Sequence, residues 1–293
     1  MMLQRFRAQT FVLGDVSIHG RIGGSGPALL LLHGHPQTHV MWHRVADALA
    51  QRFTVVALDL RGYGDSSRPE PDPEHLSHSK RRMASDALAV MHQLGHARFF
   101  VAAHDRGARV AHRLAADHPQ AVERLLLLDI APTLAMYQNT SEAFARAYWH
   151  WFFLIQPPPL PERLIEADPV FYLRSVMGSR HAGLAAFDPR AMTEYERCVR
   201  QPGTAASICE DYRASASIDL EHDRADQARG SKLQMPLRAL WGLHGTVGRC
   251  FDVLGLWRER ALHVSGRALD CGHYIAEERP AELLEEMLEF FME

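Results

Sequence analysis

Short apolar runs recur along the first half of the chain, and each ends in a turn or a glycine-rich loop. Continuous apolar runs of this length are typical of strands buried on both faces of a sheet. Segments with helical spacing separate them, at 41–51, 79–95 and 108–119. The runs are PALLLLHGHP at 27–36, FTVVALDLRGYGDS at 53–66, RFFVAAHD at 98–105 and VERLLLLDIAP at 122–132.

This alternation of strand and helix with short links predicts an α/β fold with a mostly parallel central sheet flanked by helices. Parallel neighbours in a sheet need crossover connections, and helices supply them. Residues 10–22 instead alternate between apolar and polar and carry Gly14 and Gly20. That pattern predicts a hairpin ahead of the first buried strand.

The alternation of predicted strands and helices stops after residue 132, where the apolar runs typical of buried strands end. Residues 133–228 contain several helical segments, two nearby tryptophans and the proline cluster QPPPLP, and we interpret them as a helical insertion. Alternation resumes with strands at 236–242 and 262–273, and the chain ends in an amphipathic helix at 280–293. The predicted organisation is a core domain from 1–132 and 229–293, interrupted by a helical cap at 133–228.

Composition narrows the class of protein. The chain has 293 residues, 47% hydrophobic and 23% charged, which is ordinary for a globular protein. Its formal net charge is −3 and it has no basic block, which argues against a nucleic-acid partner. No apolar run reaches the length of a membrane span or of a signal peptide, and the four cysteines form no C-x-x-C pair. We therefore expect a cytoplasmic protein with free thiols and no membrane partner.

The stretch VAAHDRGARVAH at 101–112 carries the strongest chemical feature. A strand, a sharp turn and a helix in this order form the nucleophile-elbow pattern G-x-S-x-G. Here the pattern reads Ala103-His104-Asp105-Arg106-Gly107, with Asp105 in place of the serine. Asp105 could merely cap the helix. As a nucleophile, its carboxylate would attack carbon without a base and become an ester, and a base would be needed only to hydrolyse that ester.

Two arginines follow the aspartate, Arg106 and Arg109, three residues apart on one helix face. Cations in the first turn of a helix meet the positive end of its dipole, which is unfavourable. An anion between them would relieve this, either Asp105 itself or a bound carboxylate, which guanidinium groups grip in bidentate geometry.

A base and its orienting acid can be assigned from position. His273 lies between the last strand and the last helix, where the histidine of an elbow nucleophile belongs. For the acid, no carboxylate follows the strand after the insertion until Asp252, whereas Asp129 ends the run LLLLD. We therefore prefer Asp129, which would hold His273 in one tautomer. The backbone amides of His35, in the HGHP turn, and of Arg106 would form an oxyanion hole.

With these residues in view, the chain resembles the α/β-hydrolase superfamily in its aspartate-nucleophile branch, and most closely the fluoroacetate (haloacetate) dehalogenases. The resemblance spans nearly the whole chain and rests on HGHPQTHVMWHRVADAL, LDLRGYGDSSRP, HDRGARVAHRLAADHP, LLLLDIAPT, AYWHWFFLIQPPPLPE and ICEDYRASA. One departure is His35, where an aromatic such as phenylalanine is expected. The segment GLHGTVGRCFDVL also differs.

The resemblance implies roles for further residues. Arg106 and Arg109 would bind the substrate carboxylate, and His150, Trp151 and Tyr212 would form a halide pocket. The three side chains carry N–H or O–H donors suited to a departing fluoride. The implied activity is hydrolysis of a haloacetate, with fluoroacetate giving glycolate and fluoride through a covalent Asp105 ester. No metal or organic cofactor is expected, the partner is a small haloacid, and the assembly is a homodimer.

Other functions fit the same fold. An epoxide hydrolase would share the aspartate but needs acidic groups for the epoxide oxygen, usually a pair of cap tyrosines. Neither that enzyme nor a haloalkane dehalogenase has a use for two arginines that bind an anion. A serine esterase is disfavoured by Asp105, and a non-catalytic binding protein by the complete set Asp105, Asp129 and His273. The tyrosines available by type are Tyr137, Tyr148, Tyr172, Tyr195 and Tyr212.

Overall fold

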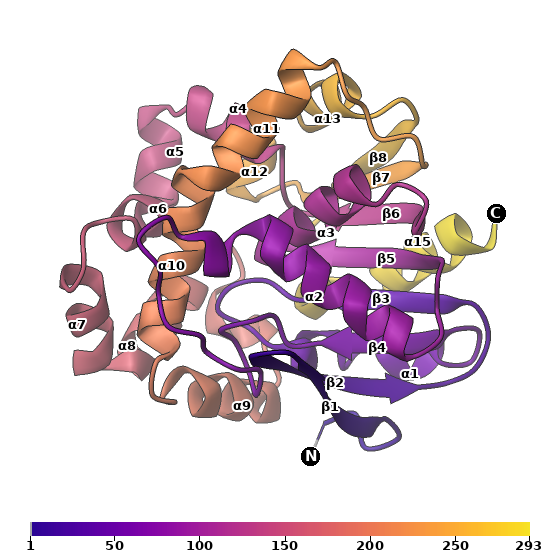
Figure 1. Cartoon of the computed structure of the whole chain (residues 1–293), viewed down its shortest axis with the longest axis horizontal. Coiled ribbons are helices and arrows are strands. Elements are labelled where there is room, and N and C mark those ends of the chain that lie inside the picture. The colour runs from indigo at the N-terminus through magenta and orange to yellow at the C-terminus, as the bar shows by residue number, and fades with distance from the viewer. Residues whose placement is uncertain (1) are drawn as a thin grey trace.

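An eight-stranded sheet runs through the molecule, with helices on both of its faces and a group of further helices at one end (Figure 1). The structure is a computed structural model that describes residues 2–293. The strand order is β1-β2-β4-β3-β5-β6-β7-β8. The strands are β1 (Arg7–Leu13), β2 (Val16–Gly23), β3 (Ala28–Leu32), β4 (Thr54–Leu58), β5 (Phe99–His104), β6 (Val122–Leu128), β7 (Leu237–Gly242) and β8 (Val264–Leu269).

The sheet is parallel from β4 to β8, whereas β1 pairs antiparallel with β2, and β2 with β4. The predicted hairpin is therefore the β1–β2 ribbon on one edge. Seven helices and two short 3-10 turns complete the core: η1 (His39–Trp42), α1 (Ala46–Leu49), η2 (Leu76–His78), α2 (Lys80–Gln93), α3 (Asp105–Asp117), α12 (Thr246–Cys250), α13 (Val253–Arg260), α14 (Ile275–Glu278) and α15 (Pro280–Met292).

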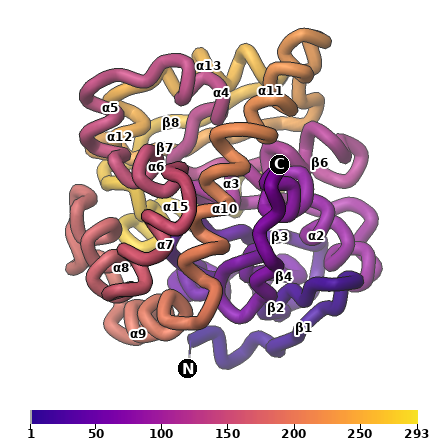
Figure 2. Tube along the Cα trace, turned by 60° about the vertical axis from the view of Figure 1, so that its left-hand side comes forward, coloured from indigo at the N-terminus to yellow at the C-terminus, as the bar shows by residue number. Residues whose placement is uncertain are grey.

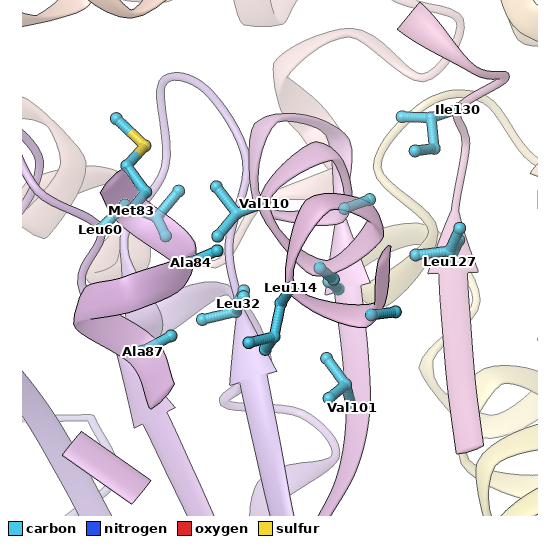
Figure 3. Packing of buried hydrophobic residues seen from close by; sticks show 14 of the residues in the cluster. Leu32, Leu60, Met83, Ala84, Ala87, Val101, Val110, Leu114, Leu127 and Ile130 are labelled. Carbon is cyan, nitrogen blue, oxygen red and sulfur yellow. The ribbon is translucent and has the colours of Figure 1, made fainter. Parts of the chain in front are cut away.

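Alternate residues of each central strand enter two separate hydrophobic cores. In β3, Leu30 and Leu32 pack with residues of α2 and α3, while Leu29 and Leu31 pack with residues of α1 and α15. Figure 3 shows the first core, where Leu32 and Leu114 lie between strand and helix. Because both faces of the strand are covered, the sequence of β3 is uniformly apolar, as in other parallel sheets.

Helices alone occupy the segment between β6 and β7, which is the segment proposed as the cap (residues 133–228). They gather at the end of the sheet where the parallel strands finish, and α10 crosses in front of α3 in the turned view of Figure 2. They are α4 (Thr133–Gln138), α5 (Glu142–Ala147), α6 (Trp149–Leu154), α7 (Leu160–Ala167), α8 (Pro169–Gly178), η3 (Gly183–Ala186), α9 (Pro189–Val199), α10 (Thr204–Ala216) and α11 (Ile218–Ala228).

The α/β fold and its mostly parallel sheet are as predicted, and several element boundaries differ. The last strand, expected at 262–273, is β8 (Val264–Leu269). The helix expected at 41–51 is a 3-10 turn and one short helix, α1, separated by three residues. The helix expected from residue 108 begins at Asp105 itself, so the elbow has no linker between strand and helix. Among the described residues, none of the helices combines the length and the apolarity needed to cross a bilayer.

Candidate active site

Asp105 lies at the junction of β5 and α3, on a backbone with φ of 46°. Such a left-handed angle is uncommon for a residue with a side chain and is held only where neighbours enforce it. The Gly107 amide donates to the His33 carbonyl at 2.9 Å, and a Cβ on Gly107 would lie 2.3 Å from that oxygen. A Cβ on Gly34 would lie 2.6 Å from the Asp105 Cβ. Both glycines are therefore required for the turn to present this carboxylate.

His273 and Asp129 form a buried pair beside Asp105. Nδ1 of His273 lies 2.5 Å from Oδ2 of Asp129, and a carboxylate can only accept, so Nδ1 carries the proton. The Gly242 amide donates to the other Asp129 oxygen at 2.9 Å, which satisfies that buried acid. Nε2 of His273, then free to accept, lies 3.9 Å from Oδ2 of Asp105. The structure thus brings together the three residues predicted as the catalytic set.

The loop that carries His273 is tied to the elbow by the residue preceding the candidate nucleophile. Nε2 of His104 lies 2.9 Å from the backbone carbonyl of His273, and so donates to it. Burial, together with the neighbouring His273, lowers the pKa of His104 to about 3, so the ring stays neutral. A neutral ring can hold this bond without adding charge to the site.

One half of the predicted oxyanion hole is in place. The His35 amide donates to Oδ1 of Asp105 at 3.0 Å. The Arg106 amide, by contrast, makes no hydrogen bond to that carboxyl in the part of the chain that the structure describes. Oδ1 is therefore the oxygen already held by the protein, and Oδ2 is the one left facing His273.

The Asp105 carboxylate is stabilised in its charged form although it is only 4% exposed. Burial by itself would raise its pKa, but the electrostatic influence of His273, His104, Arg106 and Arg109 outweighs burial. The pKa of Asp105 consequently lies well below its ordinary value. The carboxylate is ionised at any pH at which the fold is expected to survive.

Arg106 is fully buried, and its counter-ion comes from the cap rather than from Asp105. Its Nε and Nη2 donate to the two carboxylate oxygens of Asp211, on α10, at 2.9 and 2.8 Å. Nη2 also donates to the Ser215 hydroxyl, and Lys80 and Tyr63 donate to the same Asp211 carboxylate. Nη1 is buried and has no protein partner among the described residues. One edge of the guanidinium is fixed by the fold, which leaves Nη1 for a ligand.

Arg109 is also buried, and its hydrogen-bond acceptors are all neutral. Nη1 donates to the Thr133 hydroxyl at 2.8 Å and to the Ala131 carbonyl at 3.3 Å, and Nη2 contacts the sulfur of Met136. No carboxylate forms an ion pair with it among the described residues, and its Nε has no partner there. A buried cation without a paired anion is costly, so this position favours binding of an anion.

The three predicted halide-pocket residues lie together over the arginines. The Arg106 guanidinium lies 4.0 Å from the centre of the Tyr212 ring, and that of Arg109 lies 4.7 Å from Trp151. The Trp151 and Tyr212 rings are 6.4 Å apart, and His150 is 5.9 Å from Tyr212. Trp151 Nε1 and the Tyr212 hydroxyl are buried donors with no acceptor among the described residues. Burial and the nearby Arg180 hold the pKa of His150 well below its usual range, so its neutral ring offers one N–H.

The side chain of His35 forms part of the same aromatic group. Its ring lies 5.5 Å from Tyr212 and 6.3 Å from His150, and its Nε2 is 3.1 Å from the Tyr172 hydroxyl. Burial lowers the pKa of His35 to about 3. His35 therefore replaces the expected phenylalanine with a neutral ring of similar packing that ties the elbow region to α8 of the cap.

A different cluster meets the spacing of a metal site. His19, His39 and Asp59 place their ligand atoms within 4.8 Å of one another. Asp59, however, already accepts from His39 Nδ1 at 2.8 Å and from the amides of His39 and Asp65. We interpret Asp59 as a structural acceptor that fixes the loop after β4.

Two participants were not found by sequence reasoning, Asp211 and Arg180. Asp211 lies 105 residues after Arg106 and reaches it only because α10 packs beside the elbow. The sequence offers one indication of its role. Asp211 precedes the predicted pocket residue Tyr212 in ICEDYRASA, and an acid in that place can form an ion pair with an arginine of the site. Arg180, in the turn after α8, has no motif around it.

A mostly parallel sheet with a charged aspartate at the strand–helix elbow, a histidine–acid pair beside it and a helical cap defines an aspartate-type α/β-hydrolase. The chain matches the alpha/beta hydrolase fold family over residues 27–280 and belongs to it. It is 43% identical to the fluoroacetate dehalogenase of a Burkholderia species, over 99% of this chain and 95% of that protein.

Two further relatives support the same family. A soluble epoxide hydrolase of Corynebacterium sp. strain C12 is 35% identical over 96% of this chain and 95% of its own length. A crystal structure of an alpha/beta hydrolase from Nostoc sp. PCC 7120 superimposes with a TM-score of 0.96, at 52% identity and 99% coverage of both chains. The predicted resemblance to the superfamily is confirmed. A fluoroacetate dehalogenase and an epoxide hydrolase thus both occur among its relatives.

Proposed function

We propose that the protein is a haloacetate dehalogenase, with fluoroacetate as the best candidate substrate. The proposal rests on two buried arginine N–H groups, Arg106 Nη1 and Arg109 Nε, that have no acceptor in the part of the chain that the structure describes. They lie on the helix that begins with the candidate nucleophile, under two ring donors that also lack acceptors. A haloacetate suits both sets of donors, because its carboxylate can accept from the arginines and its departing halide can accept from the ring donors.

In the first step the substrate carboxylate accepts from the two arginines. Oδ2 of Asp105 attacks the α-carbon from the side opposite the halogen, forming a C–O bond as the carbon–halogen bond breaks. The bonding pair leaves with the halide, which His150, Trp151 and Tyr212 stabilise by hydrogen bonds. Donors that strengthen only as charge develops on the halogen lower the barrier, and fluoride needs them most.

In the second step Nε2 of His273 takes a proton from water, and the resulting hydroxide attacks the carbonyl carbon of the Asp105 ester. Oδ1, already hydrogen-bonded to the His35 amide, carries the developing negative charge. Asp129 holds the His273 Nδ1 proton and stabilises the imidazolium. The intermediate collapses, glycolate leaves with the proton from His273, and Asp105 loses its own proton to regenerate the carboxylate.

The test is release of halide and glycolate by purified protein supplied with fluoroacetate or chloroacetate, with Asp105→Ala as the matched control. The proposal predicts fluoride and glycolate in equal amounts from the unchanged protein and none from the variant. Chloride release without fluoride would retain the mechanism and remove fluoroacetate as the substrate. No halide from either acid, together with hydrolysis of a neutral epoxide, would replace the proposal by an epoxide hydrolase.

We also propose that the protein acts in the cytoplasm as a homodimer. All four cysteines are unpaired, which suits a reducing compartment. Exposed apolar side chains gather on the neighbouring cap helices α7 and α8, where Leu160, Leu164 and Phe171 are 54%, 57% and 69% exposed. A patch of this kind supports a self-contact. Light scattering on the unchanged protein and on Leu164→Glu with Phe171→Glu should show a dimer and a monomer, and identical masses would refute this interface.

A further inference from the structure

A cavity of about 160 Å³ lies beside the candidate active site, between the cap and the loops that follow β7 and β8. His273 is the one member of the proposed catalytic set in its lining. The other lining residues come from the end of α5, the start of α6, the turn after α8, the loop after β7 and α12. The basic side chains of the lining are Arg146, Arg180, Arg249, His181, His244 and His273.

The lining is strongly biased toward positive charge. It contains three arginines and three histidines and has no aspartate or glutamate. Two of the side chains have acidic partners outside the lining, since Arg146 pairs with Glu142 at 2.7 Å and His244 with Asp270 at 2.8 Å. Arg249 is exposed, and its side chain has no hydrogen-bond or ion-pair partner in the described part of the chain. The field at the mouth of the cavity is therefore cationic.

Arg180 marks the inner end. Its Nη1 donates to the Ala147 carbonyl at 3.3 Å, and its buried Nε makes no hydrogen bond within residues 2–293. The guanidinium lies 4.4 Å from the centre of the Tyr148 ring. That ring is in turn 5.3 Å from His150 and 6.3 Å from His273. Arg180, which also lies beside the Tyr274 hydroxyl, thus stands between the cavity and the halide pocket, where its guanidinium can donate to an anion.

We propose that this cavity is the passage for small anions between solvent and Asp105. Arg249 attracts them at the mouth, and Arg180 binds them transiently at the inner end. The proposal rests on the proposed function, since it concerns an anionic substrate and two anionic products. Without the arginines, an incoming carboxylate would meet the charges of Asp105 and Asp129. A passage lined by one sign of charge offsets that repulsion and raises the local concentration of the opposite sign.

The first test measures kcat/KM for fluoroacetate as a function of ionic strength, in the unchanged protein, in Arg249→Glu and in Arg7→Glu. Arg7 lies exposed on β1, at the opposite edge of the sheet, so the two variants change the net charge equally. We expect Arg249→Glu to lower kcat/KM by about three- to tenfold at low salt, with the loss shrinking as salt screens the charges. Arg7→Glu should leave kcat/KM unchanged.

The second test does not require turnover. Crystals of the whole chain soaked in bromide should show an anomalous peak in the cavity next to Arg180, and crystals of Arg180→Met should lack it. If fluoride is released but Arg249→Glu behaves like Arg7→Glu, the proposed passage is wrong and the proposed function stands. If no halide is released, the proposed function fails, and the bromide map is then the only test of anion binding in the cavity. Bromide beside Arg180 supports it, and a cavity without bromide overturns it.

Discussion

Arg106 and Arg109 look equivalent in the sequence, but substitution of each should change the stability of the protein by a different amount. Arg106 is the buried partner of Asp211, whereas Arg109 has neutral acceptors only. We compare Arg106→Met with Arg109→Met, because methionine keeps much of the side-chain length and removes the charge. The first variant should lose stability as well as substrate binding, and the second should lose substrate binding with little change in stability.

The magnitudes follow from the contacts. Arg106→Met leaves the Asp211 carboxylate, which is 0% exposed, with Lys80 as its remaining cationic partner. Breaking a buried ion pair in this way costs about 3–5 kcal/mol, which corresponds to a fall in Tm of roughly 5–15 °C. Arg109→Met loses three bonds to neutral acceptors, each worth about 1 kcal/mol or less, and gains from removing a buried unpaired charge. Its Tm should therefore move by only a few degrees.

For substrate binding, Arg109→Met removes a charge-assisted hydrogen bond to the carboxylate. Such a bond contributes about 1.5–3 kcal/mol, so kcat/KM for fluoroacetate should fall by about 10- to 150-fold. The assay pairs thermal unfolding with fluoride release from fluoroacetate and from neutral fluoroacetamide, whose rate should be far less affected. If Arg109→Met unfolds as early as Arg106→Met and retains its preference for the acid, the reasoning about the two arginines is refuted.

Three further variants test other parts of the account. Trp151→Phe keeps an aromatic ring but removes a buried N–H donor, so kcat/KM should fall further with fluoroacetate than with chloroacetate. Equal losses with the two substrates would exclude Trp151 from the halide pocket. His35 is neutral above about pH 4, because burial lowers its pKa to about 3. The pH profiles of kcat/KM for the unchanged protein and His35→Phe should therefore have the same shape between about pH 5 and 9, and a shifted limb would show that His35 titrates. Burial raises the pKa of Glu277 from 4.5 to about 7, so the folded state keeps a proton that the unfolded state releases. Stability should fall as pH rises through that window, by up to about 3 kcal/mol, and Glu277→Gln should lose this slope in denaturant titrations at pH 5 and 8. A slope that persists in the variant would assign it to another group.

The fold was largely predictable from the spacing of apolar and polar residues, because each buried strand and each helix is formed by contiguous residues. The run ALLLL became β3 with each leucine in one of the two cores. The segment 41–51 was predicted as one helix because apolar spacing cannot show where the backbone turns. There the chain forms η1, turns, and forms α1, with buried Trp42 and Leu49 on separate elements.

The candidate site was predictable where its residues belong to motifs and unpredictable where contacts join distant segments. Asp105, Asp129 and His273 follow strands, and the topology brings strand ends together. The partnership of Arg106 with Asp211 depends instead on how α10 packs against the elbow. The place of Arg180 depends on the turn after α8, which no spacing in the sequence specifies.

The central claim is that Asp105 forms a covalent ester which water activated by His273 hydrolyses. His273→Asn removes the base while leaving the nucleophile and the arginines, so the ester should accumulate. Mass spectrometry of this variant after exposure to fluoroacetate should show a gain of about 58 Da, the carboxymethyl group less the displaced proton, on the peptide that contains Asp105. The unchanged protein should show no lasting gain. Release of fluoride by the variant without any added mass on that peptide would contradict the account.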